Sequence, residues 1–371
     1  MDDYEAEFPI APPSPLKGRG AVTNLQGRYE RDQREAFDDG WLPENEGGAS
    51  PSLKTQLFEE RAKSILTRNA SPDIPFSVSL NPYRGCEHGC IYCFARPTHS
   101  YLGLSPGLDF ESRLYAKINA PELLQRELSK KTYVPEPIAL GVNTDAYQPV
   151  ERTLQLTRRV IEVLHDHGHP FAAITKSSLI ERDIDLLAPM AERGQVMAAV
   201  TITTLDAEIA RTLEPRAATP MRRLRTIRAL SEAGIPVGVS IAPVIPFVTE
   251  PDLERVLEAC AQAGATSASY IVLRLPWEVA PLFKDWLAAH FPQRAERVMA
   301  RVRDMRGGKD YDSSFARRMK GEGAWADLLK QRFDKAVKRL GLNARRHGIL
   351  DMSHFKPPTV AEPPNRQLDL F

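Results

Sequence analysis

The middle of the chain alternates short apolar segments with amphipathic helical segments, and this alternation restricts the fold more than any other feature. The apolar segments are rich in β-branched residues, as are parallel strands that are buried on both faces. They span residues 77–81, 138–143, 171–175, 196–203, 237–242 and 269–273. Strands that alternate with helices predict a series of βαβ units, and therefore a parallel sheet.

The helical segments carry residues that mark helix boundaries. Thr219 followed by Pro220 is typical of a helix start, and Gly234 closes the same segment. Two other helical segments end at Gly168 and Gly264. An open doubly wound sheet fits this alternation, but the simple repetition favours a partial or complete α/β barrel. In either fold, functional side chains lie at the carboxyl ends of the strands.

Composition excludes several classes of protein. The formal net charge of +1 over 371 residues excludes a polycation that binds nucleic acid with its whole surface. The sequence has no apolar run of about 18 residues, and its acidic start lacks the pattern of a secretory signal. Three of the four cysteines fall within eight residues, which indicates a metal or redox site in a reducing compartment. We therefore expect a cytoplasmic protein without membrane association.

Charge and proline content divide the chain into four parts. Residues 1–50 carry 5 Lys/Arg against 11 Asp/Glu and predict an acidic, largely extended segment. Residues 51–275 would form the barrel. Residues 276–350 would form a helical, basic extension, since residues 294–347 hold 16 Lys/Arg against 7 Asp/Glu. Residues 351–371 form a proline-rich tail.

The first expected strand leads directly into a cysteine-rich loop. Cys86, Cys90 and Cys93 have the spacing C-x3-C-x2-C, and glycines between them permit a tight loop. Three thiolates can therefore converge on one metal centre. They would leave one iron of a cubane iron–sulfur cluster without a protein ligand, and that iron could bind a substrate or cofactor.

Zinc is the alternative occupant of this loop. Three cysteines with His88 or His99 would form a Cys3His set, which is common in structural zinc sites. Zinc ligands more often come as two separated pairs, and the sequence has no second pair. Cys260 lies in an amphipathic helical segment, where we expect it in the core. A zinc protein of this kind would be a non-enzymatic module that binds nucleic acid or a partner.

The sequence resembles the radical S-adenosylmethionine (SAM) superfamily in its cysteine spacing, in Tyr92 before the last cysteine, and in the six-fold β/α repeat around this loop. The segments NPYRGCEHGCIYCFARPTH, TDAYQPVE, ITKSS, LEPRAATPMRRL and APVIP are similar to the subgroup related to spore photoproduct lyase, and within it to an uncharacterised bacterial branch. The resemblance covers roughly residues 77–275. It implies a partial (β/α)6 TIM-like barrel with N- and C-terminal extensions.

The resemblance implies a specific chemistry. In this superfamily three cysteines hold a [4Fe–4S] cluster, which corresponds to Cys86, Cys90 and Cys93. The remaining iron binds SAM, and one electron, here from a flavodoxin- or ferredoxin-like donor, cleaves SAM to methionine and a 5′-deoxyadenosyl radical. That radical abstracts a hydrogen atom from a substrate, which the sequence does not identify.

The resemblance also implies the residues that bind SAM. Thr144, after the second strand, would contact its amino or carboxylate group. Lys176, at the end of the third strand, would pair with the carboxylate, since a carboxylate in a closed site needs a cation. Thr201 and Thr203 end the fourth strand on one face, and one of them would contact the ribose or carboxylate. Residues 242–245 would offer backbone and apolar surface to the adenine, while each threonine could equally be an ordinary strand residue.

One position departs from spore photoproduct lyase, in which a cysteine at the end of the second strand returns a hydrogen atom to the substrate. Asn143 occupies that position here and has no weak S–H bond, so we do not expect thymine-dimer repair by that route. Glu214 and Arg216 follow the fourth strand, and they either face the open end of the barrel or pair with each other.

Two features near the C-terminus suggest a link to DNA. Basic residues mixed with aromatic ones in residues 294–347 are typical of nucleic-acid contact, although a solvated helix face has the same composition. The peptide QLDLF, from Gln367 to Phe371, resembles the motif by which bacterial repair and replication proteins dock on the DNA polymerase sliding clamp. Its alternative is a terminus that packs on its own domain. Nucleic acid and the clamp are therefore candidate partners.

Overall fold

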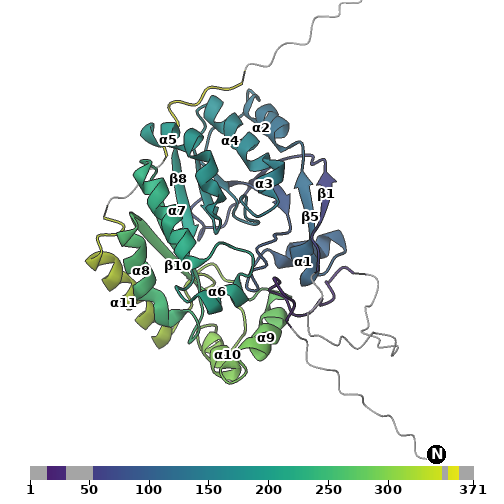
Figure 1. Cartoon of the computed structure of the whole chain (residues 1–371), viewed down its shortest axis with the longest axis vertical. Helices are drawn as coiled ribbons and strands as arrows, with labels where there is room; N and C mark the ends of the chain where they lie inside the picture. Colours follow the sequence, from purple (N-terminus) through teal and green to yellow (C-terminus); the bar gives the residue numbers. More distant parts are fainter. Residues whose placement is uncertain (1–14, 31–52, 345–349, 359–371) are drawn as a thin grey trace, which may run out of the picture.

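The computed structural model describes residues 15–30, 53–344 and 350–358, and within them a seven-stranded sheet forms the centre of the molecule (Figure 1). Six of its strands are parallel and adjacent in the order in which they occur along the chain. These strands are β3 (Val78–Leu80), β6 (Ile138–Leu140), β7 (Phe171–Thr175), β8 (Val196–Thr201), β9 (Val237–Val244) and β10 (Ser267–Val272). The seventh, β2 (Leu66–Arg68), pairs antiparallel with β3 at the edge.

The strand order decides between the two folds that the alternation allows. A doubly wound sheet reverses its strand order at a switch point, whereas this order runs without reversal from β3 to β10. The sheet is therefore that of a partial α/β barrel, and the fold prediction is confirmed. Each of the six predicted segments overlaps one of the parallel strands. The barrel is not closed, since β2 and β10 are the two edges of the sheet.

Helices connect successive parallel strands and pack against one another around the sheet (Figure 1). The principal connecting helices are α2 (Ala120–Leu128), α4 (Leu156–Asp166), α5 (Ile184–Glu192), α7 (Pro220–Glu232) and α8 (Leu253–Gln262), with the short α3 (Glu151–Leu154) and α6 (Ala207–Leu213) between them. The Thr219 side chain accepts a hydrogen bond from the backbone N–H of Arg222, as expected of an N-cap. Gly168, Gly234 and Gly264 adopt positive φ angles of 57°, 76° and 104° just beyond their helices.

A small second sheet stands beside the barrel and was not predicted from the sequence. It consists of β1 (Gln56–Glu60), β5 (Arg113–Lys117) and β4 (Tyr83–Arg84) in the order β1, β5, β4. The strand β4 immediately precedes the cysteines, and α1 (Leu108–Ser112) and the 3-10 helix η1 (Arg96–Leu102) follow them. The strand β1 is mostly exposed, so its sequence lacks the apolar character by which the other strands were found.

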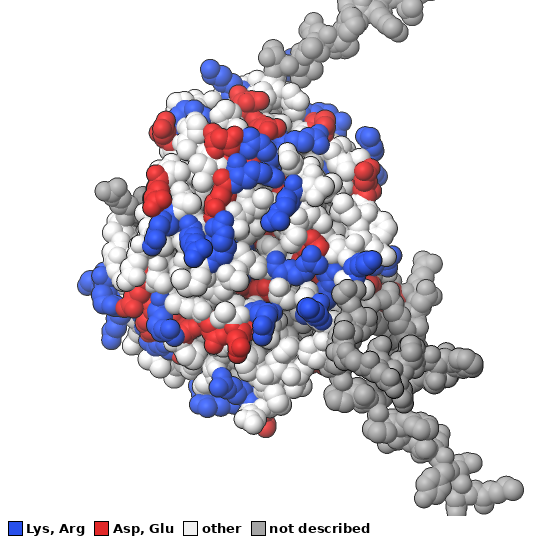
Figure 2. All heavy atoms as spheres, in the orientation of Figure 1, with Lys and Arg blue, Asp and Glu red and all other residues white. Residues whose placement is uncertain are grey.

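The C-terminal extension contains α9 (Val279–His290), α10 (Ala295–Asp304) and α11 (Ala324–Arg339). The helix α11 packs on α8, and Arg332 forms ion pairs with Glu250 and Glu254 there. Arg339 likewise pairs with Glu258. On the face drawn in Figure 2, Lys and Arg side chains alternate with Asp and Glu. The basic extension thus pairs many of its charges within the protein, as a solvated structural face does.

The remaining predictions concern the ends of the chain. Residues 15–30 contain turns but neither helix nor strand. Most of the predicted acidic segment, residues 1–14 and 31–50, lies outside the described residues. The peptide from Gln367 to Phe371 does too, so clamp binding stays a prediction. In the described ranges, no helix is both long and apolar enough to cross a membrane.

Candidate active site

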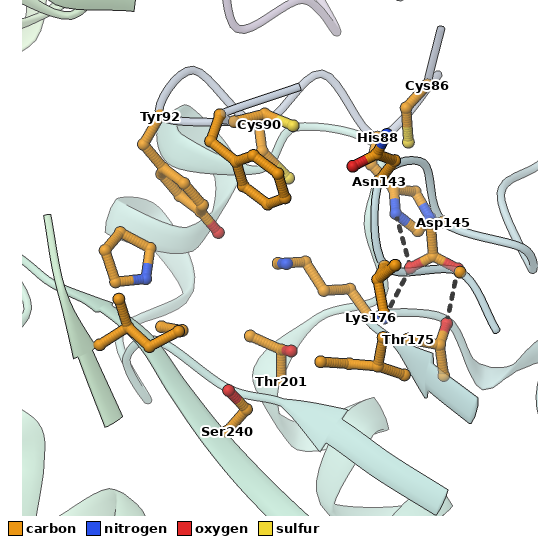
Figure 3. A pocket seen from close by; sticks show the side chains of 18 of the residues that line it. Cys86, His88, Cys90, Tyr92, Asn143, Asp145, Thr175, Lys176, Thr201 and Ser240 are labelled. Carbon is orange, nitrogen blue, oxygen red and sulfur yellow. Dashed lines mark hydrogen bonds and ion pairs between the residues drawn. The ribbon is translucent and has the colours of Figure 1, made fainter. Parts of the chain in front are cut away.

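A cavity opens at the carboxyl ends of the parallel strands, and all three cysteines of the loop line it. The wall also includes Lys176 just after β7, Thr201 at the end of β8 and Ser240 within β9. Figure 3 shows the Lys176 side chain extending into the middle of the cavity, toward the cysteine loop. The topology therefore brings together residues that are separated by up to about 190 positions in the sequence, as the strand-end argument predicted.

The cysteine loop is compact, and it shields two of its three cysteines, Cys86 and Cys90, from water, while Cys93 is half-buried. Gly85 and Gly89 adopt φ angles of 74° and 67°, a region that L side chains rarely occupy. Cys86 and Cys90 are only 7% and 8% exposed. Burial raises the pKa of Cys90 to about 12 and that of Cys86 well above its ordinary value. Thiolate formation here therefore requires a bound cation that displaces the proton.

A buried ion pair fixes the backbone of this loop. Arg96 is fully buried, and its guanidinium donates to the carbonyl oxygens of Cys90 at 2.9 Å and Gly89 at 3.0 Å. The same guanidinium pairs with Glu111 at 2.5 Å. The fork of Arg96 thus ties two residues of the loop to one carboxylate.

The N-terminal segment, residues 15–30, covers this ion pair. The Glu111 carboxylate accepts hydrogen bonds from the backbone N–H groups of Gly20 at 2.9 Å and Ala21 at 2.8 Å. A Cβ on Gly20 would lie 1.9 Å from the carbonyl oxygen of Gly89, so the segment approaches the loop as closely as glycine permits. Residues 15–30 are therefore part of the structure that holds the cysteines.

A second buried cluster anchors the loop from the barrel side. Glu214 is 2% exposed, and its carboxylate accepts a hydrogen bond from the Tyr92 hydroxyl and pairs with Arg223. Arg216 pairs instead with Glu87, at 3.1 Å. Glu214 and Arg216 thus neither pair with each other nor line the cavity, and each holds the cysteine loop in place.

Lys176 offers a free cation to the cavity. In the part of the chain that the structure describes, its Nζ forms no hydrogen bond or ion pair, and it lies 5.8 Å from the centroid of the Tyr92 ring. Burial opposes its charged form, but the neighbouring Cys90 and Glu214 side chains outweigh burial and raise the pKa of Lys176. A charged amine without a partner in a partly closed site is suited to a carboxylate.

Asp145 is a buried carboxylate of the cavity wall that the sequence did not single out. It accepts hydrogen bonds from the Thr175 hydroxyl and the Lys176 backbone N–H, both at 2.8 Å, and it lies 3.3 Å from Nδ1 of His88 (Figure 3). Burial works against its charged form, but His88 and these hydrogen bonds hold the pKa of Asp145 at about 2. The carboxylate therefore joins the cysteine loop to the strand end that carries Lys176.

The threonines of the expected SAM site do not all reach the cavity. Thr201 lines it, whereas the Thr203 hydroxyl points to Glu214 at 3.4 Å. The Thr144 hydroxyl donates to the carbonyl oxygen of Tyr83 at 2.9 Å, and Thr144 lines a neighbouring groove. Asn143 lines both the cavity and the groove. The strand β8 ends at Thr201, so the alternation that would place Thr203 on the same face does not extend to it.

Sequence reasoning also missed Ser240, in β9, and Arg274, two residues beyond β10. Ser240 is a polar residue within an apolar strand, and Arg274 is a charged residue in the apolar run that ends β10 and continues to Leu275. That contrast is the signal by which they could have been found.

The donor set of three cysteines fits an iron–sulfur cluster. Among the described side chains, no group of three or more His, Cys, Asp or Glu is arranged to hold a single metal ion. His99 Nε2 lies 2.9 Å from the carbonyl oxygen of Arg113, and His88 Nδ1 lies 3.3 Å from the Asp145 carboxylate. A cubane cluster takes one thiolate per iron, which places its ligands further apart than those of one ion.

Comparison with known proteins bears on these observations. The model of the radical SAM superfamily matches residues 80–260. An uncharacterised protein of Mycobacterium tuberculosis is 37% identical over 271 residues, which cover 70% of this chain and 79% of the relative. The chain belongs to the radical SAM superfamily. A second uncharacterised relative of this radical SAM protein, from Methanocaldococcus jannaschii, is 25% identical over 245 residues, or 66% of this chain and 87% of the relative.

Solved structures agree with this assignment at the level of the fold. A point mutant of spore photoproduct lyase superposes on this radical SAM protein with a TM-score of 0.52 at 14% identity, covering 77% of this chain and 80% of the lyase. The same lyase complexed with dinucleoside spore photoproduct gives a TM-score of 0.50 with the same coverage. The resemblance stated from the sequence is therefore confirmed, both for the superfamily and for a fold like that of the lyase.

Proposed function

We propose that this protein is a radical SAM enzyme that holds a [4Fe–4S] cluster on Cys86, Cys90 and Cys93. The observation that carries this proposal is the convergence of the three cysteines on one cavity with the unpaired cation of Lys176. A cluster bound there would supply the electron that cleaves SAM reductively into methionine and a 5′-deoxyadenosyl radical. The residues of the chain bind the two cofactors, shield the site from water and orient the substrate.

The contacts to SAM follow from the cavity wall. Lys176 would pair with the SAM carboxylate, and the Thr201 and Ser240 hydroxyls would contact its polar groups. Pro243 and Ala242 offer an apolar wall to the adenine. Asn143 takes the place that Thr144 held in the sequence-based prediction, because only Asn143 reaches the cavity.

A groove beside the cavity supports nucleic acid as the first substrate class to test. Its lining includes Arg61, Lys63, Arg84 and Lys117 against one acidic residue, Glu60. Asn143 lines both the groove and the cavity, so a polyanion in the groove would lie next to the reacting centre. The four cysteines are free thiols, which fits a reducing, cytoplasmic location and an electron donor of the flavodoxin or ferredoxin kind.

The test is anaerobic purification with iron and sulfide analysis, followed by incubation with dithionite and SAM and an assay for 5′-deoxyadenosine. We expect about four irons per chain and formation of 5′-deoxyadenosine. The Cys90→Ala variant should lose both, while Cys260→Ala should keep both, because Cys260 is buried in α8 and does not line the cavity. A colourless wild-type protein that binds zinc and leaves SAM intact would refute the proposal.

A further inference from the structure

Arg274 lies in the cavity wall with poor partners for its charge. Its Nη1 points to the thioether sulfur of Met319 at 3.6 Å, and its Nη2 to the Tyr311 hydroxyl at 3.5 Å. Its Nε is buried and has no hydrogen-bond partner among the residues that the structure describes. Within residues 15–30, 53–344 and 350–358, no carboxylate forms an ion pair with this guanidinium, whose five N–H donors are therefore nearly unused.

Two almost fully buried arginines of this chain are much better satisfied. Arg223 pairs with Glu214 and donates to two carbonyl oxygens, at 2.7 Å and 2.9 Å. Arg306 also lacks a partner at Nε, but its two terminal nitrogens donate to three carbonyl oxygens at 2.5 to 3.0 Å. Arg274 is only partly buried, but its Nε is enclosed, and enclosing part of a charged group without such partners disfavours the folded state. The exception at Arg274 therefore indicates a group that is held for a ligand.

The position of Arg274 separates it from the expected SAM carboxylate. Lys176 follows β7 and Arg274 follows β10, and β8 and β9 lie between these strands in the sheet. The two cations thus reach the cavity from different sides and can serve two different anions. The Arg274 guanidinium also lies 5.3 Å from the centroid of the Phe94 ring, which is 43% exposed and lines the same cavity.

We propose that Arg274 binds an oxyanion of the substrate, a carboxylate or a phosphate group, with Phe94 as the adjoining apolar wall. The planar fork of a guanidinium matches the two oxygens of such a group. This inference rests on the proposed function, because it takes the cavity as the place where the substrate is bound. It makes Arg274 a residue that selects anionic substrates.

The test is calorimetric titration of the full, anaerobically reconstituted chain with inorganic phosphate and, separately, with acetate. SAM is present, no reductant is added, and ionic strength is constant. We expect Arg274→Gln to weaken binding of the preferred probe about tenfold or more. Arg274→Lys keeps the charge but lacks the planar fork of the guanidinium. Its affinity for the probe should therefore lie between that of the wild type and that of Arg274→Gln. Arg193→Gln should leave binding unchanged, because Arg193 donates to Gln195 just before β8, at the opposite end of that strand.

The outcomes separate this inference from the proposed function. A preference for phosphate assigns a phosphorylated substrate, and a preference for acetate assigns a carboxylate. Unchanged binding in Arg274→Gln, or no binding of either probe to the wild type, would overturn the role of Arg274, even if SAM cleavage is observed. If Arg274→Gln loses binding of the probe while the wild type does not cleave SAM, the oxyanion site is supported and the radical mechanism is refuted. If Arg274→Gln does not fold by circular dichroism, Arg274→Lys decides: affinity equal to the wild type overturns the proposal.

Discussion

Single residues of the cavity divide into those that present free groups and those whose groups are already bound within the protein. The Lys176 amine is available, whereas the Thr144 hydroxyl is committed to the carbonyl oxygen of Tyr83. Both residues lie in the loop after a parallel strand, and both have side chains that could bind a carboxylate. Their local sequences therefore do not distinguish them. The distinction comes from the backbone of β4, which packs against the residues after β6 and supplies an acceptor for Thr144.

This contrast predicts the result of two substitutions on SAM affinity. Lys176→Gln should raise the dissociation constant of SAM roughly ten- to hundredfold, since a hydrogen bond to a charged group contributes about 1.5–3 kcal/mol. Thr144→Val should leave it unchanged. The measurement is equilibrium dialysis of labelled SAM against the reconstituted proteins without reductant. Equal affinity in the wild type and Lys176→Gln would remove Lys176 from the site.

At the scale of elements, the cysteine loop depends on segments that are remote in sequence. Arg96 and Glu111 fix it from one side, Glu214 from the barrel, and the N-terminal segment covers it.

The sequence predicted the six strands well, because buried parallel strands require runs of apolar residues. The strand β1 and the contacts of residues 15–30 could not be predicted, since both depend on long-range pairing that leaves no local pattern. The cysteines and Lys176 were found by motif, whereas Asp145 needed the fold.

The N-terminal segment gives a prediction at this scale. In Gly20→Ala the new Cβ would collide with the carbonyl oxygen of Gly89, which is only 1.9 Å away. We expect the free energy of unfolding to fall by about 1–3 kcal/mol and the bound cluster to be lost faster in air. Urea denaturation and the decay of the cluster absorbance measure the two effects. Gly18→Asn is the control, because no atom lies within 4 Å of a Cβ there and Asn tolerates its φ of 74°. Identical decay in Gly20→Ala and the wild type would contradict the role of the segment as a cover.

At the scale of the whole molecule, the C-terminal extension connects the two open edges of the sheet. The carbonyl oxygen of Met319 accepts a hydrogen bond from the backbone N–H of Val272, at the end of β10. The adjacent Arg318 forms a two-pronged ion pair with Asp73, at 2.5 Å for each contact, in the connection from β2 to β3. A short segment thus bridges the gap that a complete barrel would fill with further strands.

This bridge yields the last prediction. The side chains of Arg318 and Asp73 are only 14% and 13% exposed, so their pairing is less screened by solvent than a surface ion pair. We expect Arg318→Ala to lower the free energy of unfolding by roughly 1–3 kcal/mol and to speed hydrogen exchange in residues 306–322, with little change in β7 and β8. Exchange measured by mass spectrometry tests this prediction. The matched control is Arg317→Ala, because Arg317 is about half exposed and pairs with Asp312 and Glu322 of the same segment rather than across the gap. Equal increases of hydrogen exchange in Arg317→Ala and Arg318→Ala would contradict this prediction. The ion pair with Asp73 would then not stabilise residues 306–322, and packing alone would close the open side of the barrel.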